Sequence, residues 1–282
     1  VTFVVLDDVI RAGLDSLFPG QVVLEAAAFR LTRDSELELD DEGGQSYVEA
    51  LEVDLRRRRK SDVVRLEIDG SASDVLASLL AGLAGLDGDD LYRVPGFLDL
   101  RALWGIVDLP GFETLRDPGM KPVPVLGEGD AGRIFDVLDA GDLLVHHPYD
   151  GFEPVLALVE QAADDPDVLA IKQTLYRPGS DSPVVAALMR AADRGKQVTV
   201  VVELMARFDE ERNLRWSRAL EEAGAHVIYG IRGLKVHAKC CMVVRRTPLG
   251  LRRYVHVGTG NYNHRTARLY TDVGLLTSSP SI

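Results

Sequence analysis

The strongest constraint on the fold is an alternation of helix and strand patterns that begins near residue 150. Segments with helical apolar spacing (152–165, 182–195 and 209–224) alternate with short apolar segments typical of buried strands (168–176, 197–204 and 226–230). Strands that alternate with helices favour right-handed crossovers and a largely parallel sheet covered on both faces. We therefore predict an α/β domain here, extended by three further strand-rich segments (235–246, 252–260 and 267–277).

The preceding part of the chain has mixed patterns. Helical spacing covers residues 6–18, 46–60 and 72–86, and residues 63–70 alternate as in a strand. Ser73 or Asp74 is a suitable N-cap for the helix near residue 74. Proline and glycine concentrate in residues 115–132, so we place a domain boundary near residue 125. The chain is thus expected to hold an α+β domain (1–125) followed by an α/β domain (126–282).

Composition restricts the partners. With 32 basic and 44 acidic residues, the chain lacks the broad basic surface of a non-specific nucleic-acid binder, so an anionic ligand needs a local pocket. We interpret the basic run 56–60 as the end of a helix rather than a nucleic-acid contact. Cys240 and Cys241 are the only cysteines, and as strand neighbours they encode neither a structural disulfide nor a zinc site, which favours a cytoplasmic protein.

Two further expectations concern the limits of the chain. No apolar run approaches the ~20 residues that a membrane span needs, so we expect no integral membrane segment. Because the sequence opens on Val1, without a starting methionine, we expect it to be a piece of a longer protein.

The stretch GLKVHAKCCMVV (233–244) contains a pattern that suggests chemistry. If it is a strand, its two-residue period places Lys235, His237 and Lys239 on one face. Arg177 and Arg207 follow two strands of the predicted parallel sheet, at the rim where ligands collect. Guanidinium and ammonium groups around one histidine form a site for a phosphate-like oxyanion, and like charge keeps a ring nitrogen unprotonated as a nucleophile.

Other candidates have more ordinary interpretations. GTGNYN (258–263) is more typical of a turn than of a phosphate cradle. His146 and His147 precede a proline, and we expect them in a loop without a metal. Tyr270 alternates with Asp272 and fits a half-buried strand aromatic, although on the site face it could stack on a base.

Together these motifs resemble a known family. HAK followed by GTGN is similar to the HxK and Gly-Asn elements of the phospholipase D superfamily. The longer strings IKQTLYR, VVELMARFDEE, GLKVHAK, YVHVGTGNYN and ARLYTDVGLLT look like bacterial polyphosphate kinase, which builds polyphosphate from ATP through a phosphohistidine. The resemblance implies that residues 1–125 are most of a head domain used in dimer contacts, and that 126–282 are most of a first phospholipase-D-like α/β sandwich domain.

The resemblance also implies roles for individual residues. His237 corresponds to the autophosphorylated histidine, Arg177 and Arg207 to the magnesium-phosphate site, and Tyr270 to an ATP contact. Asn261 stands in the Gly-Asn element and is a further candidate contact. Since guanidinium has no lone pair for a metal, we interpret both arginines as clamps on phosphates that Mg²⁺ also holds.

Lys235 and Lys239 are expected to stabilise charge on the transferred group, and Asp272 to orient the imidazole. Met205 departs from the family, which typically has lysine there, so a cation is absent near the rim. ATP, ADP and polyphosphate are the implied ligands, and a homodimer or homotetramer is implied, with association to a membrane surface left open.

Two alternatives remain open from the sequence. A phospholipase-D-like phosphodiesterase uses the same nucleophile on a diester but needs two HxK elements, of which this chain has one. The chain could also be an inactive fragment that folds, dimerises through its first domain and binds polyphosphate.

Overall fold

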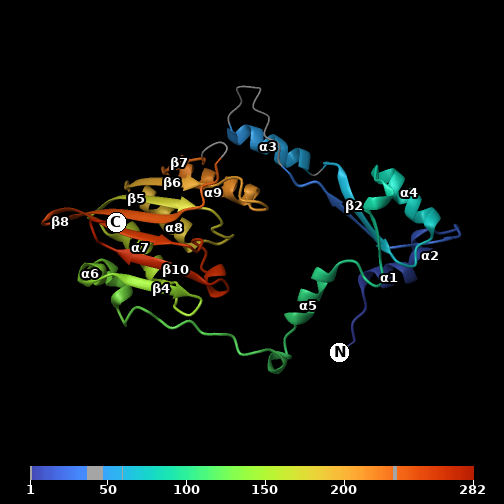
Figure 1. The fold of residues 1–282 in the computed structure, drawn as a ribbon, viewed down its shortest axis with the longest axis horizontal. Coiled ribbons are helices and arrows are strands. Elements are labelled where there is room, and N and C mark those ends of the chain that lie inside the picture. The colour runs from blue at the N-terminus through green and yellow to red at the C-terminus, as the bar shows by residue number, and fades with distance from the viewer. Residues whose placement is uncertain (1, 37–46, 59, 231–233) are drawn as a thin grey trace. The chain divides into compact units, whose positions relative to one another are not determined.

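In the computed structural model, the described residues are 2–36, 47–58, 60–230 and 234–282. They form two compact units, Val1–Asp117 and Pro118–Ile282 (Figure 1). The division lies in the proline- and glycine-rich segment where the sequence places a boundary near residue 125. Each unit is described by itself.

The first unit contains a small sheet with short helices. Its strands are β1 (Phe29–Arg33), β2 (Val63–Asp69) and β3 (Leu91–Val94), and its α-helices are α1 (Leu6–Ala12), α2 (Leu14–Leu17), α3 (Tyr47–Arg58), α4 (Asp74–Ala84) and α5 (Trp104–Val107). The strand order is β1-β2-β3, with β1 antiparallel and β3 parallel to β2. Ser73 caps α4, because its Oγ accepts a hydrogen bond from the Leu76 N–H at 3.1 Å. The single helix expected over residues 6–18 is instead two short helices that meet at Gly13.

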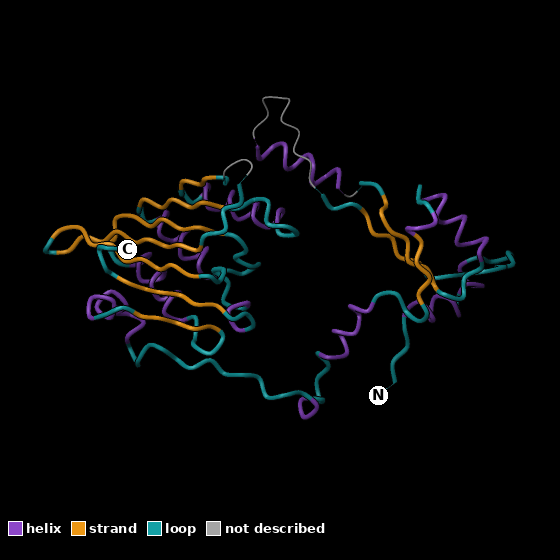
Figure 2. The backbone as a smooth tube through the Cα atoms, viewed as in Figure 1, coloured by secondary structure: helices purple, strands orange, loops and turns teal. Residues whose placement is uncertain are grey.

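The second unit is built on one sheet of seven described strands with a helix layer (Figure 2). The strands are β4 (Leu143–His147), β5 (Val168–Leu175), β6 (Gln197–Val202), β7 (His226–Ile228), β8 (Lys239–Thr247), β9 (Gly250–Gly258) and β10 (Asp272–Thr277). The helices are α6 (Ile134–Ala140), α7 (Glu153–Asp164), α8 (Pro183–Asp193) and α9 (Glu210–Glu222). Short 3₁₀ turns occupy Gly88–Asp90, Leu100–Leu103, Glu113–Leu115, Asp130–Arg133 and Thr266–Arg268 across the two units.

The sheet is mixed, which corrects the expectation of a largely parallel sheet. The strand order is β4-β10-β9-β8-β5-β6-β7, and among these strands only the β5–β6 and β6–β7 pairs are parallel. The other four pairs are antiparallel, because β8, β9 and β10 follow one another through turns and loops rather than helical crossovers.

Burial also corrects the expectation that helices cover both faces. On β5, Ile171, Gln173 and Leu175 are buried, whereas Lys172 is exposed and Thr174 half-buried. This alternation indicates a helix layer over one face of the sheet. None of the helices in the described part of the chain has the length and hydropathy to cross a bilayer.

Two local expectations are wrong. The strand expected from Lys235 begins at Lys239, so Lys235 and His237 lie in the segment that leads into β8, and Gly233 lies outside the described residues. His146 and His147 lie in β4, not in a loop, because they pair with Val273 and Asp272 of β10. Buried His147 has its Nδ1 3.0 Å from the Asp150 carbonyl oxygen.

Candidate functional site

The candidate residues converge at one edge of the seven-stranded sheet for a topological reason. β5 and β6 are parallel, so Arg177 and Arg207, which follow them, lie beyond the same edge. β8 runs antiparallel to β5, so His237, just before β8, reaches that edge as well. The same reasoning places the end of β9 and the start of β10 there, with Asp272 as the first residue of β10.

His237 lies against a buried lysine and an aromatic ring. Its Nε2 is 3.0 Å from Nζ of Lys239, which is 6% exposed. The Tyr176 ring meets the imidazole edge-on, with ring centroids 4.8 Å apart and planes at 86°. While Lys239 is an ammonium it can only donate, so Nε2 is the acceptor and its lone pair is directed at the ammonium. The geometry presents one ring nitrogen, Nε2, beside a cation.

The protonation of Lys239 is tuned by its surroundings. Burial lowers the pKa of Lys239, and the negative charge of Asp272 partly opposes this shift. Asp272 also accepts a hydrogen bond from the Thr259 Oγ1 at 2.8 Å. The hydrogen bond described for His237 is the one to Lys239, so the orientation of the imidazole by Asp272 stays a prediction; what the structure gives for Asp272 is its effect on the pKa of Lys239.

The backbone on both sides of His237 is held by side chains. The Val236 N–H donates to Oε2 of Glu203 at 2.7 Å. On the other side, the Thr174 Oγ1 donates to the Ala238 carbonyl at 2.7 Å and accepts from the Cys240 N–H at 3.0 Å. Glu203 follows β6 and Thr174 lies near the end of β5, so the parallel strands fix the histidine segment.

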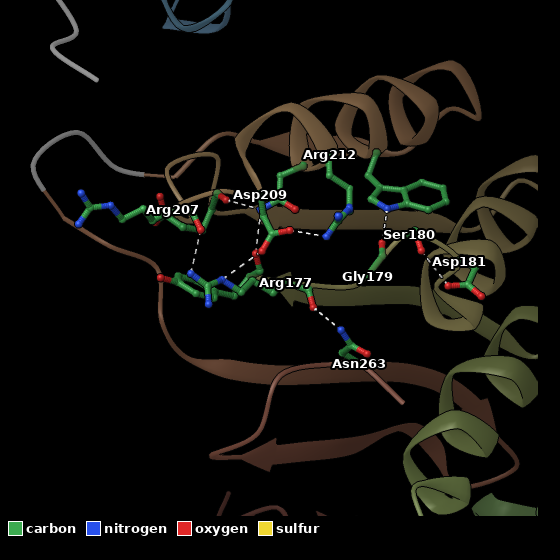
Figure 3. A network of polar contacts seen from close by, with 12 residues as sticks. Arg177, Gly179, Ser180, Asp181, Arg207, Asp209, Arg212 and Asn263 are labelled. Atoms are coloured by element: carbon green, nitrogen blue, oxygen red, sulfur yellow. Dashed lines mark hydrogen bonds and ion pairs between the residues drawn. The ribbon is translucent and has the colours of Figure 1, made fainter. Parts of the chain in front are cut away.

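Arg177 belongs to an ion-pair network at the same edge (Figure 3). Its Nε lies 3.2 Å from Oδ2 of Asp209, and its Nη2 donates to the Arg207 carbonyl at 3.0 Å. The other carboxylate oxygen of Asp209 pairs with Arg212 on α9. The Arg177 side chain keeps 42% of its surface exposed, so it is oriented yet accessible to an anion.

Arg207 and Phe208 form the outer part of this network. Arg207 is exposed, and its guanidinium carbon lies 5.5 Å from the centroid of the Phe208 ring. Phe208 has a φ of 70°, in the left-handed region that a residue with a bulky side chain rarely adopts. The turn after β6 therefore adopts an unusual conformation where it presents Arg207.

The remaining candidates occupy the loop after β9 and the start of β10. Lys235 is exposed, two residues before His237, and Tyr270 is 63% exposed. Asn261 is half-buried, and its Oδ1 has no hydrogen-bond partner among the described residues. It is Asn263 that contacts the arginine segment, because its Nδ2 donates to the Arg177 carbonyl at 3.2 Å.

Sequence reasoning missed several residues that order this site, Thr174 and Asn263 among them. Tyr176 sits directly beside Arg177, Glu203 sits directly after β6, and Asp209 lies two residues after Arg207, which was a usable signal. Buried Asn213 had no such signal: from α9 its Nδ2 donates to the carbonyls of Tyr176 and Glu203, both at 2.8 Å.

The described residues do not fit a directly ligated Mg²⁺. Within 2–36, 47–58, 60–230 and 234–282, no group of three or more His, Cys, Asp or Glu side chains could hold a metal ion. Arg177 and Arg207 offer no lone pair, and Asp209 is already paired with two guanidinium groups.

Comparisons with known proteins agree on one family. The family model described as polyphosphate kinase C-terminal domain 1 matches residues 133–282, and the polyphosphate kinase middle domain matches residues 1–106. Polyphosphate kinase of Mycolicibacterium paratuberculosis is 49% identical over 286 residues, covering 100% of this chain and 39% of that protein. The Rhodopirellula baltica enzyme is 48% identical, covering 98% and 32%.

A solved structure gives the same match. The crystal structure of polyphosphate kinase from Porphyromonas gingivalis aligns with a TM-score of 0.71 and 31% identity, over 97% of this chain and 39% of that chain. The predicted α/β fold class, with a phospholipase-D-like second domain, is confirmed by this match. The chain spans between 32% and 39% of the length of these relatives.

Proposed function

The chain belongs to the polyphosphate kinase family, and we propose that the complete protein containing it transfers the terminal phosphate of ATP to polyphosphate, reversibly, through a phosphohistidine at His237. The observation that carries this proposal is the 3.0 Å contact between His237 Nε2 and the buried Lys239 Nζ, at the same sheet edge as Arg177. A nucleophilic nitrogen beside fixed cations suits attack on a phosphoryl group.

The first step uses the Nε2 lone pair. Nε2 attacks the γ-phosphorus of ATP, the Nε2–P bond forms, and the bond from γ-phosphorus to the β,γ-bridging oxygen breaks. ADP leaves with that electron pair. In the second step a terminal oxygen of polyphosphate attacks the phosphorus, and the Nε2 electron pair returns to the imidazole. Both steps are reversible because each exchanges one phosphoryl donor for another.

The cations have separate roles in this scheme. Lys239 lies at the attacking nitrogen, and its ammonium transfers its hydrogen bond from Nε2 to a phosphoryl oxygen as ATP binds, which frees the Nε2 lone pair for attack. Arg177 and Arg207, with Lys235, hold the charge of the remaining phosphates. The Tyr176 ring restricts rotation of the imidazole through its edge-on contact. Tyr270 is a candidate for stacking on the adenine, since its ring is 63% exposed.

Magnesium enters the proposal only through the nucleotide. Because the described side chains do not fit a directly ligated ion, any Mg²⁺ would arrive bound to the phosphates of ATP, which the arginines clamp. We include a homodimer or homotetramer in the proposal as the assembly implied by the family resemblance.

Turnover of ATP by the complete protein tests the proposal. The protein is incubated with γ-labelled ATP, and the label is followed into phosphate chains of increasing length. A diester reporter is assayed in parallel. We expect polyphosphate synthesis in the wild type, at least a thousandfold less in His237→Ala, and no diester cleavage. Diester cleavage without polyphosphate synthesis would instead support a phospholipase-D-like hydrolase.

A further inference from the structure

Glu203 is a buried carboxyl group that touches both functional segments. Its side chain is 3% exposed, and it directly follows β6. Oε2 accepts the Val236 N–H at 2.7 Å, one residue before His237. Oε1 accepts the Met205 N–H at 2.9 Å, in the turn that leads to Arg207. One carboxyl group thus joins the histidine segment to the arginine turn.

The contact with Val236 supplies what the sheet does not. Residues 235–238 belong to no strand of the described structure, so no ladder bonds fix the backbone at His237. The hydrogen bond from Val236 to Glu203 takes their place on one side, and Thr174 holds the Ala238 carbonyl on the other. The Val236 N–H is partly buried and its acceptor is a buried carboxyl group, so the Glu203 contact favours one position of this backbone.

Glu203 is itself rigidly held. Its backbone N–H donates to the Leu175 carbonyl at 2.9 Å, and its carbonyl accepts from the Asn213 Nδ2 at 2.8 Å. Asn213 is fully buried and also bonds the Tyr176 carbonyl. The carboxyl group therefore projects from a backbone fixed to β5 and α9, and not from a mobile loop.

We infer that Glu203 is a positioning residue for phosphoryl transfer. Its two hydrogen bonds fix the backbone next to His237 relative to the turn that carries Arg207. This inference rests on the proposed function, but its backbone part can be measured without catalysis. A shift of about 1 Å in a reacting group can reduce a rate up to about 100-fold, so loss of this contact should affect chemistry more than folding.

The test compares Glu203→Gln with a matched control in the complete protein. Glutamine keeps the volume of the side chain but places an NH₂ against one of the two backbone N–H groups. Glu153→Gln is the control, because Glu153 Oε1 also accepts a backbone N–H at 2.7 Å, from Val125. Residue-resolved amide hydrogen exchange is measured at Val236, with Val255 in β9 as the reference for global folding, and His237 phosphorylation by ATP is followed in a single turnover.

We expect Val236 to exchange at least tenfold faster in Glu203→Gln, with Val255 unchanged, and the phosphorylation rate to fall between about 10- and 100-fold. Glu153→Gln should change neither. Unchanged Val236 exchange, or faster exchange at an unchanged phosphorylation rate, would overturn the inference.

If Glu203→Gln does not fold, the wild type still decides: the Val236 amide must exchange more slowly than those of its neighbours Lys235 and His237. Labelling that persists in His237→Ala would refute the proposed function while leaving the exchange result intact.

Discussion

The Arg177 Nε lies 3.2 Å from Oδ2 of Asp209, so the direction of the guanidinium is set by a carboxylate that is itself only 15% exposed. Arg212 pairs with the other carboxylate oxygen of Asp209, so one carboxylate forms ion pairs with two guanidinium groups. The arrangement leaves Arg177 with N–H donors free to turn toward an anion while one side of the fork is fixed.

Replacing Asp209 by Asn should therefore disorder Arg177. We expect kcat/KM for ATP in Asp209→Asn to fall roughly 10- to 100-fold, because the ion pair that orients the Arg177 guanidinium is lost and a misplaced group can reduce a rate by up to about 100-fold. Steady-state kinetics on the complete protein measures this. Asp164→Asn is the matched control, since Asp164 also pairs with two arginines, Arg190 and Arg194, away from the site. Equal kinetics in both variants would contradict the role of Asp209.

The lowered pKa of Lys239 lets us predict how the rate of His237 phosphorylation depends on pH. Burial lowers the pKa of Lys239 from 10.5, so the ammonium loses its proton at a lower pH than an exposed lysine does. We expect the rate to fall on the alkaline side with a midpoint below 10.5. Lys239→Arg should remove this alkaline limb, because guanidinium stays charged. Lys196→Arg is the control, since burial also lowers the pKa of Lys196, away from the site, and its alkaline limb should match the wild type.

Replacing Met205 by lysine should increase the affinity for polyphosphate. The Met205 side chain is half-buried, its N–H donates to Glu203, and it lies two residues before Arg207, at a position where the sequence resemblance leads us to expect lysine. Met205→Lys should bind polyphosphate more tightly by about 0.2–1 kcal/mol, which is up to about fivefold, and the gain should vanish at high salt. Fluorescence titration with polyphosphate of defined length measures it, and Met205→Leu serves as the uncharged control. A gain of equal size in both variants would show that packing, and not charge, is responsible.

His256 predicts a loss of stability in mild acid. Burial, with a smaller contribution from His147, holds the pKa of His256 at about 3, and its Nδ1 lies 2.7 Å from the Tyr262 hydroxyl. The unfolded chain has the ordinary pKa near 6.5, so between pH 6.5 and 3 it binds a proton that the folded state does not. Stability therefore falls as pH drops through 6.5, by about 1 kcal/mol between pH 6 and 5.

Urea unfolding of the second unit checks this. Trp216 fluorescence in a Trp104→Phe background reports on that unit, as the chain has two tryptophans. His256→Asn keeps a polar atom near the Nδ1 position but cannot titrate, so its stability should vary less between pH 6 and 5 than that of the wild type. Identical pH slopes would mean that His256 is not the group responsible.

Local patterns predicted most helices and strands of the second unit. The segments at β5, α7, α8 and α9 have strong apolar periodicity and clear turn residues at their ends, so the sequence pattern alone identifies them. β1, β3 and β4 were not predicted. They are short, and β4 acquires its identity from pairing with β10, a contact made across more than a hundred residues of sequence.

The site was predictable in its residue types but not in its anchors. From the alternation of Lys235, His237 and Lys239 we predict that His237 and Lys239 lie together. The structure places them 3.0 Å apart, although the strand begins only at Lys239. Asn213 and Thr174 act through backbone carbonyls and N–H groups of distant segments, and no local pattern marks a side chain that bonds backbone elsewhere. Neither could be found without the sheet order.

The most direct test is to locate the phosphoryl group on the protein. The complete protein is pulsed with γ-labelled ATP for a single turnover, digested at neutral pH, and mapped by mass spectrometry with fragmentation that preserves phosphoramidate bonds. We predict an acid-labile phosphate on Nε2 of His237, which is discharged by added polyphosphate and is absent in His237→Ala. An equally labelled His237→Ala protein, or phosphate found only on another residue of the wild type, would contradict the assignment.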